Sequence, residues 1–251
     1  MGQLIVLGSS YAIPDETHEN THFALVGPAG VVLIDCAGQP VIRLRRAGLD
    51  YAPVTDLVLT HFHPDHVYGA PMFLMEMWLR GRQEPLGLHG LRHCMERTEK
   101  LMLACDVREW PRLFPVTYHS VAESDDVLLL ENSDFRITAT PVKHFVPTIG
   151  LRIVDKRSGR VLAYSSDTEP CPGAYRLAQQ AALLLHEAAG RGIGHTSAAQ
   201  AGEIARAANA KRLVLIHYPT GENDTSRLVP EASAEFGGPV TLAQDFMTLE
   251  W

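Results

Sequence analysis

The 251-residue chain has few cysteines, no long apolar run and no excess of positive charge. Its four cysteines form neither a CxxC pair nor a dense framework, which is typical of a protein in a reducing, cytoplasmic setting. No apolar stretch approaches the roughly 18 residues that a membrane-spanning helix needs, and the N-terminus reads as a strand rather than a signal peptide. The net charge of −7 argues against a protein whose main role is to bind nucleic acid. We therefore expect a soluble protein without membrane contacts.

The chain is rich in histidine. It has 12 histidines, and three of them lie within residues 61–66 (HFHPDH), directly after an apolar run. His61 and His63 lie two residues apart on an extended segment, so their rings can face the same side. After the proline the chain turns, which can bring Asp65 and His66 inward. Neutral imidazole and carboxylate suit Zn²⁺, Mn²⁺ or Fe when no thiolate is offered. The pattern predicts a metal site, the alternative being a polar loop that happens to be rich in histidine.

Short aliphatic runs separated by glycine and proline turns predict two strand-rich halves, each flanked by helices. Strands are expected at Leu4–Gly8, His22–Gly27, Val31–Asp35, Asp56–Thr60, Val116–His119, Val127–Leu130, Phe135–Thr140, Ile149–Val154, Val161–Ser165, Ala182–His186 and Leu213–His217. Helices are expected at Gln39–Ala47, Val67–Arg80, Arg92–Cys105, Tyr175–Gln180 and Ala198–Ala208. Ser197 and Gln200 can form a capping box at the start of the last of these helices. No linker or repeat interrupts the chain, so we expect a single domain over residues 1–251.

The HFHPDH run resembles the HxHxDH signature of the metallo-β-lactamase superfamily, and other segments resemble tRNase Z-type members in the same order. These segments are Leu7-Gly8, Val32–Asp35, Tyr164–Thr168, Leu185–Ala188 and Gly194–Ala198. The resemblance implies an α/β fold, an αββα four-layer sandwich. In such a fold two mixed β-sheets lie face to face, with helices outside and the metals at one edge.

The resemblance also implies a dinuclear site for two divalent ions, Zn²⁺ in the first instance, with Mn²⁺ and Fe as alternatives. His61, His63 and His144 would hold one metal, Asp65, His66 and His217 the other, and Asp167 would bridge both. Taken alone, His144 could be a loop histidine, Asp167 a helix N-cap and His217 a buried structural histidine. The shared order and context favour the ligand interpretation.

In tRNase Z-like enzymes a pair corresponding to His186 and Glu187 lies beside the metals, where the histidine contacts the scissile phosphate or protonates the leaving oxygen. A neighbouring carboxylate raises a histidine pKa and fixes its tautomer, as a general acid requires. A structural hydrogen bond between the two is the alternative. Asp35 is expected to accept the N–H of a ligand imidazole, with an ordinary turn residue as the alternative. The chain departs from the family pattern at Ala189, where threonine is usual, and at Ser166, where glycine is common.

These assignments predict a hydrolase in which a hydroxide bridging the metals attacks, Asp65 orients it and His186 serves the leaving group. True tRNase Z enzymes carry an inserted arm for tRNA, commonly between the third histidine and the bridging aspartate, where this chain has only 22 residues. We therefore expect a small phosphodiester substrate, such as a cyclic nucleotide or cyclic sugar phosphate, and no nucleic-acid partner. The alternatives are tRNA 3′ processing, lactam or lactone ring opening, and a metal- or ligand-binding sensor. Whether the protein forms a homodimer is left open.

Overall fold

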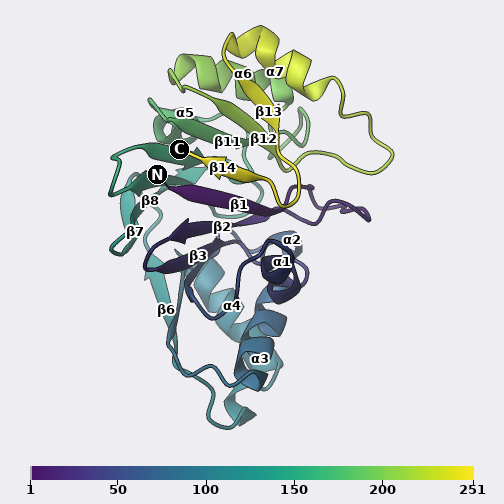
Figure 1. Cartoon of the computed structure of the whole chain (residues 1–251). Coiled ribbons are helices and arrows are strands. Elements are labelled where there is room, and N and C mark those ends of the chain that lie inside the picture. Colours follow the sequence, from purple (N-terminus) through teal and green to yellow (C-terminus); the bar gives the residue numbers. More distant parts are fainter. Residues whose placement is uncertain (1) are drawn as a thin grey trace.

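The computed structural model describes residues 2–251 and shows two seven-stranded mixed sheets packed face to face, with helices on both outer sides (Figure 1). The first sheet has the order β14-β1-β2-β3-β4-β5-β6, and the second has the order β13-β12-β11-β10-β9-β8-β7. This arrangement confirms the predicted αββα sandwich. The single-domain expectation stays a prediction.

The strands follow the aliphatic runs closely. The first sheet contains β1 (Gln3–Gly8), β2 (His22–Gly27), β3 (Gly30–Ile34), β4 (Val54–Val58), β5 (Leu86–Leu91), β6 (Val116–Val121) and β14 (Thr248–Glu250). The second contains β7 (Val127–Glu131), β8 (Phe135–Val142), β9 (Thr148–Asp155), β10 (Val161–Tyr164), β11 (Leu183–Glu187), β12 (Leu213–Ile216) and β13 (Val240–Leu242). The helices are α1 (Pro40–Arg46), α2 (Pro64–Val67), α3 (Gly69–Leu79), α4 (Arg92–Ala104), α5 (Pro172–Ala178), α6 (Ala198–Ala207) and α7 (Leu228–Phe236), with a 3₁₀ turn at Val107–Glu109.

Alternation along the strands divides the core into three layers. One cluster fills the space between the sheets, where the rings of Phe23 from β2 and Tyr164 from β10 meet edge to face at 4.9 Å. A second cluster lies under α1, α3 and α4, and a third lies under α5, α6 and α7. Both faces of each sheet are therefore covered, which explains why the central strands are apolar on both sides.

The structure differs from the expected elements in a few places. The helix expected at Val67–Arg80 is observed as α3 (Gly69–Leu79), whereas Val67 ends the separate short helix α2; the N–H of Gly69 donates to the carbonyl oxygen of Cys36 at 2.8 Å. The strand β5 was not predicted, since two glycines lower its strand propensity, and neither were α7, β13 and β14. The capping box of Ser197 and Gln200 is confirmed.

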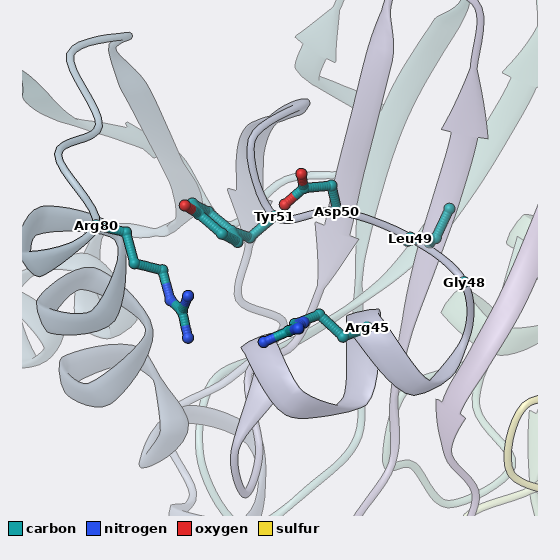
Figure 2. Close-up of a pocket in the computed structure, with 6 residues that line it drawn as sticks. All are labelled: Arg45, Gly48, Leu49, Asp50, Tyr51 and Arg80. Atoms are coloured by element: carbon teal, nitrogen blue, oxygen red, sulfur yellow. The ribbon is translucent and has the colours of Figure 1, made fainter.

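Two observations concern the surface. No helix within residues 2–251 is both long enough and apolar enough to cross a membrane. A hollow of about 520 Å³ lies at the C-terminal ends of α1 and α3, with Arg45 and Arg80 reaching into it beside Tyr51 (Figure 2). Arginines at helix C-termini offset the partial negative charge of the last carbonyls, and this explains them without a ligand. The histidine-rich run lies at the other end of α3.

Candidate metal centre

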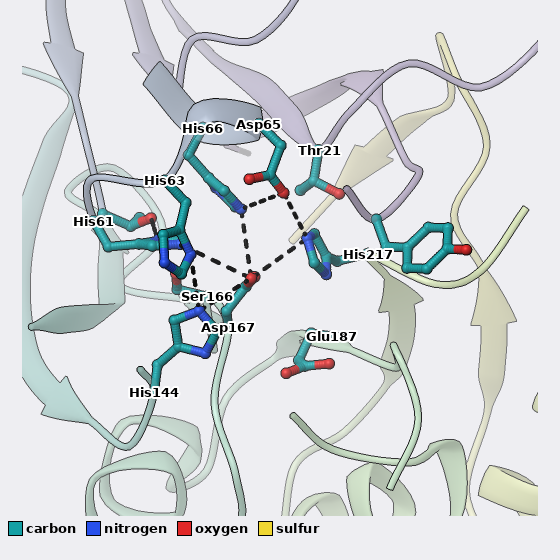
Figure 3. Close-up of polar contacts among 12 residues, drawn as sticks. Thr21, His61, His63, Asp65, His66, His144, Ser166, Asp167, Glu187 and His217 are labelled. Carbon is teal, nitrogen blue, oxygen red and sulfur yellow. Dashed lines mark hydrogen bonds and ion pairs between the residues drawn. The ribbon is translucent and has the colours of Figure 1, made fainter. Parts of the chain in front are cut away.

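All seven predicted ligands come together at one edge of the sandwich, where segments that follow strands of both sheets meet (Figure 3). They are supplied by the segments that follow four strands: β4 (His61, His63, Asp65, His66), β8 (His144), β10 (Asp167) and β12 (His217). They form two groups of the predicted composition. His61, His63 and His144 form one, and Asp65, His66, Asp167 and His217 form the other, each with ligand atoms within 4.8 Å of one another.

The first group is three imidazoles whose nitrogen atoms converge. The Nε2 atoms of His61 and His144 each lie 3.1 Å from Nδ1 of His63. Burial lowers the pKa of His61 well below its usual value and that of His144 to about 4, so these rings are held neutral. Neutral imidazoles present lone pairs, as metal ligation requires.

Asp167 lies between the two groups. Its Oδ2 atom is 3.9 Å from Nε2 of His61 and 3.8 Å from Nε2 of His144. The same oxygen is 3.6 Å from Nε2 of His66 and 3.5 Å from Nε2 of His217. Burial alone raises the pKa of this carboxyl group, but the surrounding imidazoles outweigh it and the net shift is strongly downward. A carboxylate in this position can bridge two ions.

Asp65 completes the second group. Its Oδ2 atom lies 3.5 Å from Nε2 of His66 and 3.5 Å from Nε2 of His217. Burial raises its pKa, but the two histidines lower it by more, so the group is an anion. The α2 helix explains its position, because Pro64 begins that helix and turns Asp65 and His66 back toward the strand ends.

Neighbouring groups fix the ring orientations. Nδ1 of His66 lies 2.9 Å from Oδ2 of Asp35, and this confirms the expectation for Asp35. Nδ1 of His144 donates to the carbonyl oxygen of Gly194 at 2.8 Å. Nδ1 of His61 lies 3.1 Å from the hydroxyl of Thr60, which itself donates to Asp35. When Nδ1 carries the proton, the Nε2 lone pair of each ring points into the cluster.

The cluster also holds buried polar atoms that no protein group satisfies. Nε2 of His66 and Oδ1 of Asp167 are buried and have no hydrogen-bond partner among residues 2–251. Buried polar atoms are nearly always paired, so two such atoms in one cluster need an explanation. Five imidazoles and two carboxylates facing one another fit divalent cations, and the donor set therefore suits the predicted metals.

Three of the segments that form the centre carry unusual backbone. Asp35, Ser166 and His217 have φ values of 58°, 52° and 50°, although none is glycine. Each follows a strand end, and the left-handed conformation turns the chain sharply there. Such conformations cost about 1–3 kcal/mol and cluster at functional sites. The value at Ser166 also explains why glycine is common at this position in the family.

The structure does not bring His186 to this cluster. Along β11 the side chains of Leu183 and Leu185 point between the sheets, whereas Leu184 and Ala188 lie under the helices. His186 shares the second face, is fully buried, and bonds through Nδ1 to the carbonyl oxygen of Glu187. Burial lowers its pKa to about 4, so it is a poor proton donor near neutral pH. We therefore do not retain its predicted leaving-group role.

Glu187 points the other way, toward the cluster, where it meets a histidine that the sequence analysis did not assign. Its fully buried carboxylate accepts hydrogen bonds from the backbone N–H groups of Thr168 and Ala189, each at 2.9 Å. Nδ1 of His195 lies 3.0 Å from the same carboxylate. The contact with Ala189 uses the backbone, so the side-chain departure at this position leaves it intact.

His195 is the functional candidate that we missed. Its ring stacks on that of His217 with centroids 5.9 Å apart, and lies 5.0 Å from that of His144. Burial lowers its pKa, but the hydrogen bond and the charge of Glu187 raise it by more, and the net shift is upward. The signal was present in the segment Gly194–Ala198, which carried part of the family resemblance but was given no chemical role.

A small cavity of about 100 Å³ opens directly onto the centre. Its lining combines predicted ligands with His195, Phe145 and two residues of the β1–β2 connection, Tyr11 and Ala12. The side chain of His195 is 26% exposed, whereas that of Glu187 is fully buried. A metal-dependent reaction with an adjacent proton donor can take place here.

A fold of two mixed sheets with this cluster at its edge defines a metal-dependent hydrolase of the metallo-β-lactamase type. The family described as "Beta-lactamase superfamily domain" matches residues 31–218, and the chain belongs to it. Ribonuclease Z of Methanothermobacter thermautotrophicus is 29% identical in an alignment of 311 positions that covers all of this chain and 97% of the relative.

Solved structures agree with the fold. The metallo-beta-lactamase fold protein YhfI from Bacillus subtilis superimposes with a TM-score of 0.85 at 21% identity, covering 100% of this chain and 99% of the other. The short form of human tRNase Z superimposes with a TM-score of 0.79 at 23% identity, covering 99% and 98%.

Proposed function

We propose that this protein hydrolyses small phosphodiesters with two divalent ions bound at the cluster. The observation that carries the proposal is the pair of His195 and Glu187 beside the predicted ligands. When a phosphodiester, cyclic or acyclic, loses one P–O bond, the departing alkoxide oxygen must take up a proton. A histidine that is hydrogen-bonded to a buried carboxylate can supply that proton.

Each of these residues would have a distinct role in the reaction. His61, His63 and His144 would hold one ion, Asp65, His66 and His217 the other, and Asp167 both. Two such ions supply Lewis acidity toward the phosphoryl oxygens and an activated water. Asp65, which lines the cavity, would accept a hydrogen bond from the attacking water and orient it. His195 would give its Nε2 proton to the leaving oxygen while Nδ1 remains on Glu187.

The surroundings favour a small substrate. The β9–β10 connection is a tight turn in which the N–H of Gly159 donates to the carbonyl of Asp155 at 2.8 Å, so no arm extends between His144 and Asp167. The β1–β2 connection beside the cavity carries Asp15, Glu16 and Glu19 and no lysine or arginine. Acidic residues on this connection repel a long polyanion more than a small diester.

Cleavage of tRNA precursors is the second candidate, because curated relatives that align with the whole chain are named Ribonuclease Z. That alignment has 311 positions although this chain has 251 residues, so the relative has segments that this chain lacks. The missing segment and the acidic β1–β2 connection favour the small substrate.

The two candidates are separated by supplying Mn²⁺ or Zn²⁺ to the purified protein and measuring hydrolysis of 2′,3′-cyclic AMP and of a tRNA precursor. We expect turnover of the cyclic nucleotide, its loss in Asp65→Ala, and only weak, salt-sensitive binding of the precursor in a shift assay. Tight, salt-resistant binding with site-specific cleavage would establish the second candidate instead. Turnover of a β-lactam or lactone without phosphodiesterase activity would contradict both, and metal binding without any turnover would indicate a sensor.

A further inference from the structure

An exposed aromatic ring stands at the mouth of the cavity. Phe145 directly follows the predicted ligand His144, lines the cavity, and is 61% exposed. Most large apolar side chains of the described chain are buried, so a phenylalanine open to solvent beside a polar centre is informative. Packing of the protein core does not account for it.

One side of the Phe145 ring contacts neighbouring side chains, and the other side is exposed to solvent. Its centroid lies 5.0 Å from that of His144 at an interplanar angle of 68°, and 6.1 Å from that of His195 at 66°. Gly194 makes room for it: an added Cβ there would lie 2.7 Å from Cε2 of the ring. These edge-on contacts hold the ring at the rim and leave much of its surface in solvent.

The size of the cavity determines what must lie against this ring. A volume of about 100 Å³ equals the share of only a few water molecules in the liquid. Pockets that enclose a drug-sized ligand are roughly 300–1,000 Å³. The cavity can therefore enclose the phosphoryl group between the ligands and His195, but the rest of a nucleotide has to lie on the rim, where Phe145 stands.

We infer that Phe145 stacks against the base of the substrate, and that the substrate is a nucleoside phosphodiester rather than a base-free sugar phosphate. The inference rests on the proposed function, which leaves these two substrate classes open. Every nucleobase offers a planar π-face, so one exposed ring can bind any of them without hydrogen-bonded selection. Phe145 thus favours ligands that carry a base over ligands without one, and does not distinguish one base from another.

The test compares two ligands that differ only in the base. Equilibrium binding of AMP and of ribose 5-phosphate is measured by calorimetry on metal-supplemented protein, because neither is a phosphodiester and binding does not depend on turnover. We expect AMP to bind about 5- to 150-fold more tightly than ribose 5-phosphate to the wild-type protein, as stacking on one aromatic ring typically gives.

Three variants identify the source of this preference. Phe145→Leu keeps an apolar side chain but removes the π-face and should lose most of the preference, whereas Phe145→Trp should retain it. Leu79→Ala, at a 69% exposed apolar position at the end of α3, is the matched control and should behave as wild type. Circular dichroism verifies that each variant folds.

Equal affinities of the wild-type protein for the two ligands, or an unchanged preference in folded Phe145→Leu, would overturn the inference. The proposed function is tested separately by hydrolysis of 2′,3′-cyclic AMP and of the cyclic phosphate of base-free ribose. If both are cleaved without preference for the nucleotide, the phosphodiesterase stands and the stacking inference fails. If AMP is preferred but neither diester is cleaved, the stacking surface stands and the phosphodiesterase fails.

Discussion

The Nδ1 atom of His195 lies 3.0 Å from a carboxylate oxygen of Glu187, a residue eight positions earlier that has no exposed surface. This contact joins the end of β11 to the residues that immediately precede α6. It fixes the tautomer of an imidazole that is 26% exposed, and leaves Nε2 as the nitrogen that would serve a substrate. The arrangement is that of a proton donor held by a buried acceptor.

Removing this donor should matter most when the leaving group is poor. We expect His195→Ala to slow hydrolysis of a nucleoside diester by about 10²–10⁴-fold, the usual contribution of general acid catalysis. With bis-p-nitrophenyl phosphate the loss should be much smaller, because p-nitrophenolate leaves without a proton. Metal content should be unchanged, and His119→Ala, an exposed histidine on β6, is the control. An equal loss on both substrates would instead assign His195 to phosphate binding.

Because Asp167 lies between the two groups of ligands, we expect the binding of both ions to depend on its side chain. Elemental analysis of metal-supplemented wild-type protein should give close to two ions per chain. Asp167→Ala should weaken both sites, whereas Asp65→Ala should weaken one and abolish turnover. A stoichiometry of one or less in the wild-type protein would contradict the bridging role of Asp167.

Ser166 offers a test of backbone strain. It combines a φ of 52° with a buried hydroxyl that has no partner among the described residues. Ser166→Ala removes the hydroxyl alone, while Ser166→Gly also relieves the left-handed strain at a cost in chain entropy. We expect the glycine variant to be more stable than the alanine variant by about 1 kcal/mol in urea unfolding. Equal stability of the two would show that the backbone at this position is not strained.

Gly194 should be intolerant of any side chain. An alanine there would place Cβ 2.9 Å from Nδ1 of His144, and its φ is +80°. We expect Gly194→Ala to displace His144 and lower metal affinity by about 10–100-fold, as loss of a ligand's supporting hydrogen bond typically does. Gly190→Ala is the matched control, because Gly190 also has a positive φ (123°) but faces open space. The prediction fails if both variants bind metal equally.

A buried histidine outside the ligand set predicts acid sensitivity. Burial lowers the pKa of His22 from 6.5 to about 4. Between these values the unfolded chain takes up a proton that the folded chain does not, so stability falls as the pH is lowered through this window. The loss is up to about 3 kcal/mol. His22→Asn should therefore lose less stability than the wild-type protein between pH 6.5 and 4 in urea unfolding, and parallel pH profiles would contradict the prediction.

The sequence by itself determined the fold class and the composition of the centre. Aliphatic runs of strand length, separated by turn residues, place strands whatever the surroundings are, because burial of alternate side chains requires them. The HFHPDH run then predicts metal chemistry, because its residue types lie within six positions of one another. His144, Asp167 and His217 lie far along the chain, and only their resemblance to a known pattern joined them to that run.

Tertiary structure decided which histidine faces the centre and what surrounds it. His186 and Glu187 are neighbours in sequence, but a strand sends adjacent side chains to opposite faces, and the face occupied by each depends on how the sheets pack. His195 reaches the site across a glycine-rich loop whose path no local pattern specifies. The same holds for Phe145, whose ring position depends on the absence of a side chain at Gly194, 49 positions away. Contacts between distant segments carry no local signal, and for this reason only the folded chain reveals them.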